Sequence, residues 1–219
     1  MIIWKILYNY VYCNTFLNAN SQAFLKKQNA CWKKIDYLLY WMMYVVLSIS
    51  LMKFVQTRYP DGQLYEEYLQ INNKKEGLYK KYHYNGQIME ICNYIDGKLN
   101  GEYKSYHDNG QLCVICNYIN GEINGDYQQY YNNGQIRKII NYIDGKENGE
   151  YKQYYKNGQL FIICNYVDGK ENGEYKQYSK NGQLTMICNY VDGKENGEYK
   201  QYYSNGQLCM ICNYVDEKG

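Results

Sequence analysis

The stretch Asn165-Tyr-Val-Asp-Gly-Lys-Glu-Asn-Gly-Glu-Tyr-Lys-Gln-Tyr178 recurs letter for letter at residues 189–202, and residues 141–154 differ from it by a single Ile in place of Val. A Gly-Gln pair follows each copy, and pairs of this kind recur along most of the chain. Their glycines are 24 residues apart: Gly62, Gly86, Gly110, Gly134, Gly158, Gly182 and Gly206. A fixed period of this length indicates a repeat protein, in which each unit buries its apolar residues against its neighbours.

Each repeat alternates strand-like runs with turn-forming pairs. After Gly158 comes the apolar run Leu160–Val167, then Asp168-Gly169, a short polar segment ending in Asn-Gly, and the strand-like residues 174–178. Asp-Gly and Asn-Gly between such runs predict β-hairpins, because these residues tolerate positive φ. Short connections then pair successive strands antiparallel. We therefore expect a mainly β fold: an elongated antiparallel β-meander of about seven 24-residue hairpin repeats.

The glycines of the Gly-Gln pairs are expected to form one turn of each hairpin. Those in the regular repeats are Gly86, Gly110, Gly134, Gly158, Gly182 and Gly206. In the strand before this turn, Tyr151 and Tyr154 are three residues apart and would lie on opposite faces of a regular strand. A β-bulge near the turn would reconcile the two positions.

The long strand carries apolar residues on both of its faces. Leu184, Cys188 and Tyr190 are expected to share one face by the period of two. On the other face, isoleucine recurs five places after the glycine, which indicates either a second buried face or an exposed apolar row. We interpret this row, with two tyrosines near the turns, as the candidate interaction surface, with core packing as the alternative. Its residues are Ile115, Ile139, Ile163, Ile187, Ile211, Tyr155 and Tyr203.

The cysteines predict a reduced core and no disulfide framework. Five of them occupy one position of the repeat: Cys92, Cys116, Cys164, Cys188 and Cys212. Their nearest equivalents are expected two strands apart, about 10 Å, whereas a disulfide needs Cα atoms within roughly 7 Å. Buried reduced thiols favour a cytoplasmic location.

No motif predicts catalysis or a cofactor. Cys113 and Cys116 have the spacing of a zinc motif, but residues three apart on a strand point to opposite faces, so we expect neither metal nor cofactor. His83 and His107 are interpreted as ordinary residues at the sheet rim. The net charge of +2 and the alternation of lysine with glutamate argue against nucleic acid as a partner. We therefore expect a protein that is not an enzyme.

The first 52 residues lie outside the repeats and are expected to form a short helical N-terminal cap, while residues 53–219 form the repeat array. Residues 37–52 contain no charged residue. They are interpreted as a helix that covers the open edge of the sheet, with membrane attachment and binding to a partner as alternatives. The segment is shorter than the roughly 20 residues that a membrane span requires.

At the stretches Gly149-Glu-Tyr-Lys-Gln-Tyr-Tyr-Lys-Asn-Gly-Gln-Leu160 and Asn165-Tyr-Val-Asp-Gly169, the chain resembles the MORN repeat variant family. The resemblance runs from about Phe54 to the C-terminus and implies a rolled or gutter-like antiparallel meander. It also implies a scaffold that binds an unidentified protein partner, with a module that associates with a membrane surface and an antitoxin-like inhibitor as the alternatives. We expect a non-enzymatic scaffold for protein–protein interaction.

Overall fold

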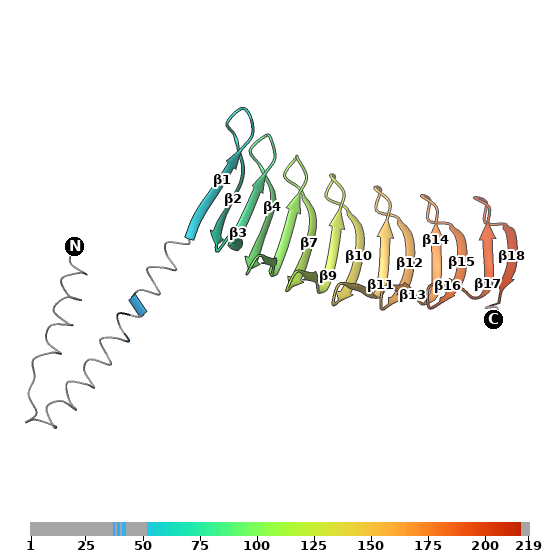
Figure 1. Cartoon of the computed structure of the whole chain (residues 1–219). Helices are drawn as coiled ribbons and strands as arrows, with labels where there is room; N and C mark the ends of the chain where they lie inside the picture. The colour runs from blue at the N-terminus through green and yellow to red at the C-terminus, as the bar shows by residue number, and fades with distance from the viewer. Residues whose placement is uncertain (1–36, 38, 40, 43–51, 216–219) are drawn as a thin grey trace, which may run out of the picture. The chain divides into compact units, whose positions relative to one another are not determined.

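The computed structural model describes residues 52–215 together with Tyr37, Leu39, Trp41 and Met42. All strands of the repeat array belong to one sheet, in which each strand pairs antiparallel with strands next to it in the chain (Figure 1). The prediction of an antiparallel meander of hairpins is confirmed. The strands are β1 (Met52–Arg58), β2 (Leu64–Ile71), β3 (Lys74–Tyr82), β4 (Ile88–Ile95), β5 (Lys98–Leu99), β6 (Gly101–Tyr106), β7 (Leu112–Ile119), β8 (Glu122–Ile123), β9 (Gly125–Tyr130), β10 (Ile136–Ile143), β11 (Lys146–Tyr154), β12 (Leu160–Val167), β13 (Lys170–Glu171), β14 (Gly173–Tyr178), β15 (Leu184–Val191), β16 (Lys194–Glu195), β17 (Gly197–Tyr202) and β18 (Leu208–Tyr214).

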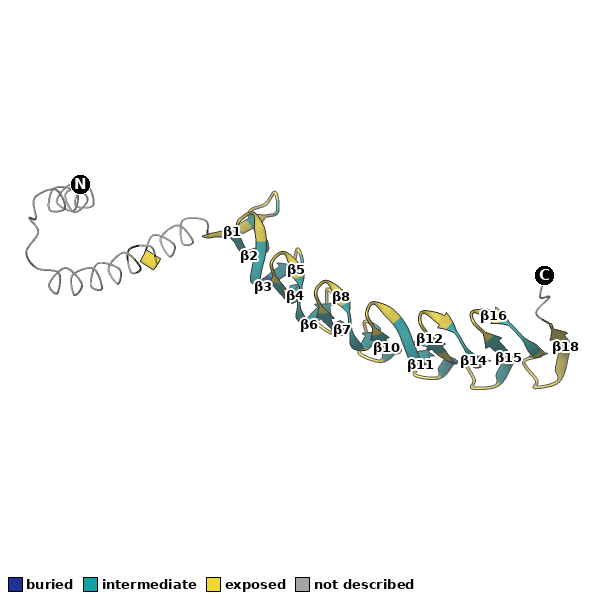
Figure 2. Ribbon diagram, turned by 60° about the horizontal axis from the view of Figure 1, so that its bottom comes forward, coloured by how far each residue is buried: buried dark blue, intermediate teal, exposed yellow. Residues whose placement is uncertain are grey.

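The two turns of each repeat have different conformations. At the Asp-Gly turn both residues have positive φ, as in Asp168 (51°) and Gly169 (81°), which is the type I′ geometry of tight hairpins. At the Gly-Gln turn a longer loop closes through a hydrogen bond from the Tyr155 amide to the Gln159 carbonyl, 2.8 Å, and Gly158 has a φ of 86°. Exposure concentrates at these turns, while the strands are mainly half-buried (Figure 2).

The polar segment between the Asp-Gly turn and the return strand also belongs to the sheet. In one repeat, Lys170 and Glu171 form β13 and pair with the end of β12. A bulge at Asn172 and Gly173 then separates β13 from β14, with the Asn172 amide bonded to the Asn165 carbonyl at 2.8 Å. Gly173 has a φ of 95°, which only glycine adopts readily.

A second irregularity lies near the Gly-Gln turn, but the bulge is on the long strand, so it does not bring Tyr151 and Tyr154 to one face. The register shifts between Gln153 and Tyr154, because Phe161 on β12 has no direct partner. The same shift corrects one prediction about the faces. Leu184 was expected beside Cys188, but it pairs with Tyr178, which is on the opposite face from the Tyr175 that pairs with Cys188.

The expected helical cap is not supported. Of the segment before the sheet, the structure describes only Tyr37, Leu39, Trp41 and Met42, which are helical and exposed, and the rest of the expected helix lies outside the described residues. Within the part of the chain that is described, no helix is both long and apolar enough to span a membrane.

Candidate interaction surfaces

One face of the sheet, here called the tyrosine face, carries a buried row flanked by tyrosines. The buried row holds one long-strand residue from each of five repeats, together with Tyr79 on β3, which pairs with the first of them. Each is at most 5% exposed: Tyr79, Cys92, Cys116, Ile140, Cys164 and Cys188. The described cysteines are free thiols, and those in this row are buried as predicted. Cys212 belongs to the last strand and is only half-buried. Burial raises the pKa of Cys116 and Cys188 to about 11, which keeps these thiols protonated.

The tyrosines of this face pack against one another within each repeat. Each pair joins a return strand to the next long strand, as in Tyr151 with Tyr166 and Tyr175 with Tyr190, whose ring centroids are 5.6 Å apart. Such edge-to-face and tilted pairs contribute about 0.5–1.5 kcal/mol beyond their buried area. Desolvation raises the pKa of Tyr151 and Tyr175 to about 12, so the rings stay neutral.

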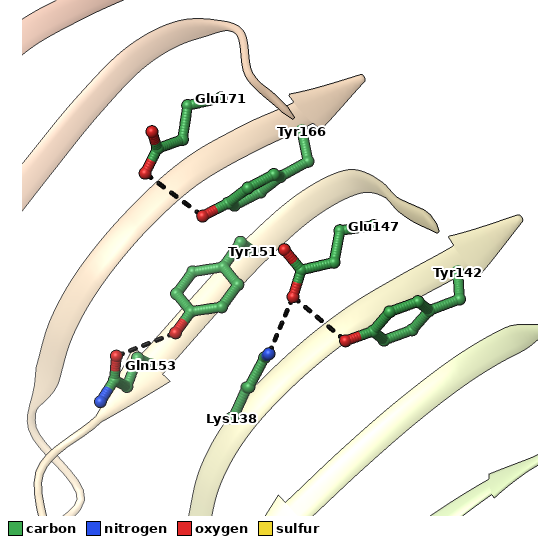
Figure 3. A network of polar contacts seen from close by, with 7 residues as sticks. All are labelled: Lys138, Tyr142, Glu147, Tyr151, Gln153, Tyr166 and Glu171. Carbon is green, nitrogen blue, oxygen red and sulfur yellow. Dashed lines mark hydrogen bonds and ion pairs between the residues drawn. The ribbon is translucent and has the colours of Figure 1, made fainter. Parts of the chain in front are cut away.

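A lysine lies among these rings in the middle of the array (Figure 3). The Lys138 ammonium is 2.9 Å from Glu147 and lies 5.6 and 5.2 Å from the ring centroids of Tyr127 and Tyr151. The Tyr142 hydroxyl donates to the same Glu147 oxygen at 3.1 Å. The ammonium is therefore held by a carboxylate and by two aromatic faces at once.

The first repeat holds an ion pair at the positions equivalent to Lys138 and Glu147, but with the acidic and basic residues exchanged. Glu66 stands three repeats before Lys138, and Lys75 stands three repeats before Glu147. The Lys75 ammonium lies 3.9 Å from the ring centroid of Tyr79 and 3.8 Å from Glu66. Two separate repeats thus place an ammonium group among the tyrosines.

The opposite face, here called the isoleucine face, is more charged. Ile163 pairs with Lys152 on one side and with Lys176 on the other, and it is half-buried. Each of these lysines also forms an ion pair with the glutamate two residues before it on the same strand, such as Lys152 with Glu150 at 2.6 Å. Of the predicted surface residues in this row, Ile115, Ile139, Ile163 and Ile187 are half-buried, and Ile211 on the last strand is 53% exposed.

Six consecutive stretches of the chain match the family model described as MORN repeat variant: residues 75–96, 99–120, 123–144, 147–168, 171–192 and 195–216. Together they cover more than half of the chain. The chain belongs to the MORN repeat variant family. No curated protein matches the chain. The match to the family model and the observed meander both indicate that the protein is a repeat scaffold.

The MORN repeats also expose a row of aliphatic residues that the sequence reasoning missed. Each of these residues directly precedes an Asp-Gly or Asn-Gly turn on the isoleucine face, and the exposed fractions run from 44 to 51%. The row consists of Ile95, Ile119, Ile143, Val167 and Val191. Their constant position before the turn was visible in the sequence, but their exposure was not.

Successive MORN repeats are joined at the Gly-Gln turns by side chains that donate to the next repeat. The Tyr131 and Tyr155 hydroxyls donate to carbonyl oxygens 23 residues further on, at 2.8 and 3.0 Å. Nε2 of His83 and His107 makes the equivalent bonds at 2.9 and 3.0 Å, and because a carbonyl only accepts, Nε2 carries the proton. The predicted surface residue Tyr155 is therefore half-buried in an inter-repeat bond.

The last two Gly-Gln turns depart from this pattern. Ser179 occupies the tyrosine position of the sixth turn, and its hydroxyl bonds within its own loop to Asn181 and the Gln183 carbonyl. Tyr203, at the seventh turn, is 54% exposed. Among the residues that the structure describes, no three His, Cys, Asp or Glu side chains are arranged to hold a metal ion.

Proposed function

We propose that this protein is a non-enzymatic scaffold that binds a partner protein along the tyrosine face of its sheet. The observation that carries the proposal is the regular presentation of half-buried tyrosine rings with hydrogen-bonded carboxylates over consecutive repeats. Tyrosine supplies contact area and a hydroxyl at a modest cost in conformational entropy. The buried thiols support a cytoplasmic location, where cysteines stay reduced.

The isoleucine face supports partner binding less well. Its isoleucine row lies between lysines that are already paired with glutamates of the same strands. A partner would have to displace or bridge these ion pairs to reach Ile163. The exposed row from Ile95 to Val191 is the part of this face that remains open to contact.

Site-specific photo-crosslinking tests the proposal in cells that express the chain. A benzophenone amino acid is placed at Gln177 on the tyrosine face or, as a matched control on the same strand, at Lys176 on the isoleucine face. We expect one discrete protein to be crosslinked from Gln177 and much less of it from Lys176. No discrete adduct from either position would refute a protein-binding scaffold, and an adduct from Lys176 alone would refute the choice of face.

A second candidate function is attachment to a membrane surface through residues 37–52. The observation in its favour is the exposure of large apolar side chains on the helical residues of this segment, 69% for Tyr37 and 58% for Trp41. Aromatic residues of this kind favour the membrane interface. Deleting residues 1–51 should then move the protein from the membrane fraction to the supernatant, and unchanged sedimentation would refute this role.

A further inference from the structure

We infer that the tyrosine face has two binding sites for ammonium groups, over Cys164 and over Cys188, and that they receive lysine side chains of an extended partner segment. The inference rests on the proposed scaffold function and names the chemistry that the scaffold recognises. The repeats themselves supply the evidence, because some of them already hold an ammonium group of this chain.

The site around Lys138 is the template. The Lys138 side chain starts on β10 two residues before Ile140, and its ammonium reaches Glu147 (Figure 3). The ammonium also lies over the rings of Tyr127 and Tyr151. The tyrosine that follows on β10 holds the carboxylate in place through its hydroxyl. A carboxylate fixed in this way, with aromatic faces on both sides, is a complete ammonium site.

One repeat later, the same groups surround Cys164 without a lysine. Cys164 pairs with Tyr151, and the register of β12 with β14 places Tyr175 on its other side. The Tyr166 hydroxyl donates to Glu171 at 3.2 Å, as Tyr142 does to Glu147 (Figure 3). Ile162 stands where the template has Lys138, so no ammonium is supplied from within the repeat.

The next repeat has the same composition around Cys188. Tyr175 pairs with Cys188, Tyr190 donates to Glu195 at 3.4 Å, and Met186 stands in the lysine position. Neither Glu171 nor Glu195 forms an ion pair with another residue of the described chain. A half-buried carboxylate beside aromatic rings attracts an ammonium group, which can pair with the carboxylate and lie against the rings as Lys138 does.

The spacing of the two sites defines the partner segment. They are one repeat apart, which is two strands or about 9.6 Å. A polyproline II helix advances about 9.3 Å per turn of three residues, so every third side chain returns to the same side. A segment with the pattern Lys-x-x-Lys in this conformation can therefore place both ammonium groups into the two sites.

A synthetic peptide of repeated Pro-Pro-Lys triplets tests the inference against the full chain by isothermal titration calorimetry, with Pro-Pro-Gln triplets as the control peptide. We expect the lysine peptide to bind and the glutamine peptide not to bind. Glu171→Gln together with Glu195→Gln should weaken binding at least about tenfold, since a hydrogen bond to a charged group typically contributes that much. The matched control is Glu174→Gln with Glu198→Gln, which removes the same charge from the same return-strand region but on the isoleucine face, and it should leave binding unchanged.

A second pair of variants tests occupancy of the sites. Ile162→Lys and Met186→Lys supply an internal ammonium as Lys138 does, so the double variant should fold and lose peptide binding. Failure of the lysine peptide to bind, equal binding of the glutamine peptide, equal loss in the isoleucine-face control, or binding of phosphatidylcholine vesicles in place of the peptide would each overturn the inference. If the crosslink from Gln177 persists when the peptide fails, the scaffold proposal stands without the lysine sites.

Discussion

Replacing Tyr131 by phenylalanine should destabilise the array by about 1 kcal/mol. The substitution keeps the ring and removes only the hydroxyl, which donates to the Tyr154 carbonyl of the next repeat at 2.8 Å. The net contribution of one such hydrogen bond is about 0.5–1.5 kcal/mol. In a repeat protein the loss falls on a single interface between neighbouring units. Urea unfolding monitored by circular dichroism should show this loss of stability as a lower midpoint with an unchanged m-value.

Tyr203→Phe is the matched control, because Tyr203 stands at the same position of the seventh Gly-Gln turn, is 54% exposed, and donates to no backbone carbonyl among the described residues. It should change stability by less than about 0.5 kcal/mol. The reverse experiment is Ser179→Tyr, which restores a donor toward the Tyr202 carbonyl and should stabilise the protein by an amount similar to the loss in Tyr131→Phe. Equal effects of Tyr131→Phe and Tyr203→Phe would refute the idea that these side chains join the repeats.

Three further outcomes are expected. Burial raises the pKa of Cys92 and Cys164 to about 12. The stability linked to these thiols is therefore complete below about pH 8.5, where unfolded cysteine is protonated, and is lost as the pH rises toward 12. Urea midpoints measured against pH would show this loss, and a flat profile from pH 8 to 11 would contradict it. A thiol reagent at neutral pH should modify exposed Cys209 within minutes and the buried cysteines only on unfolding, as peptide mass spectrometry would report. Gly169→Ala should cost about 1 kcal/mol because its φ is 81°, and an unchanged unfolding midpoint would argue against that turn conformation.

The local geometry of the turns could be predicted from sequence, because Asp168-Gly169 carries its own conformational preference. The faces of the strands could be predicted only in part. Counting by two along β15 fails at Thr185, where the register shift moves Leu184 to the other face. A bulge depends on pairing with the neighbouring strand, and a single strand contains no direct record of it.

The ammonium sites could not be predicted from the sequence. Lys138 and Glu147 are nine residues apart on different strands, and neither residue type nor spacing indicates that they meet above Ile140. Their contact depends on the register of β10 with β11, including the bulge within the return strand. The period of the sequence predicts an isoleucine row, but it does not indicate the flanking lysines, which come from neighbouring strands.

The restriction of pairing to strands close in the chain has a consequence for how such a gene can change. Residues 165–178 and 189–202 are identical in sequence, so these two units are interchangeable in the sheet. Gain or loss of a whole 24-residue unit would preserve the alternation of long and return strands, whereas a partial unit would break it. The number of units can therefore change while each one keeps its shape, and only the length of the surface would change with it.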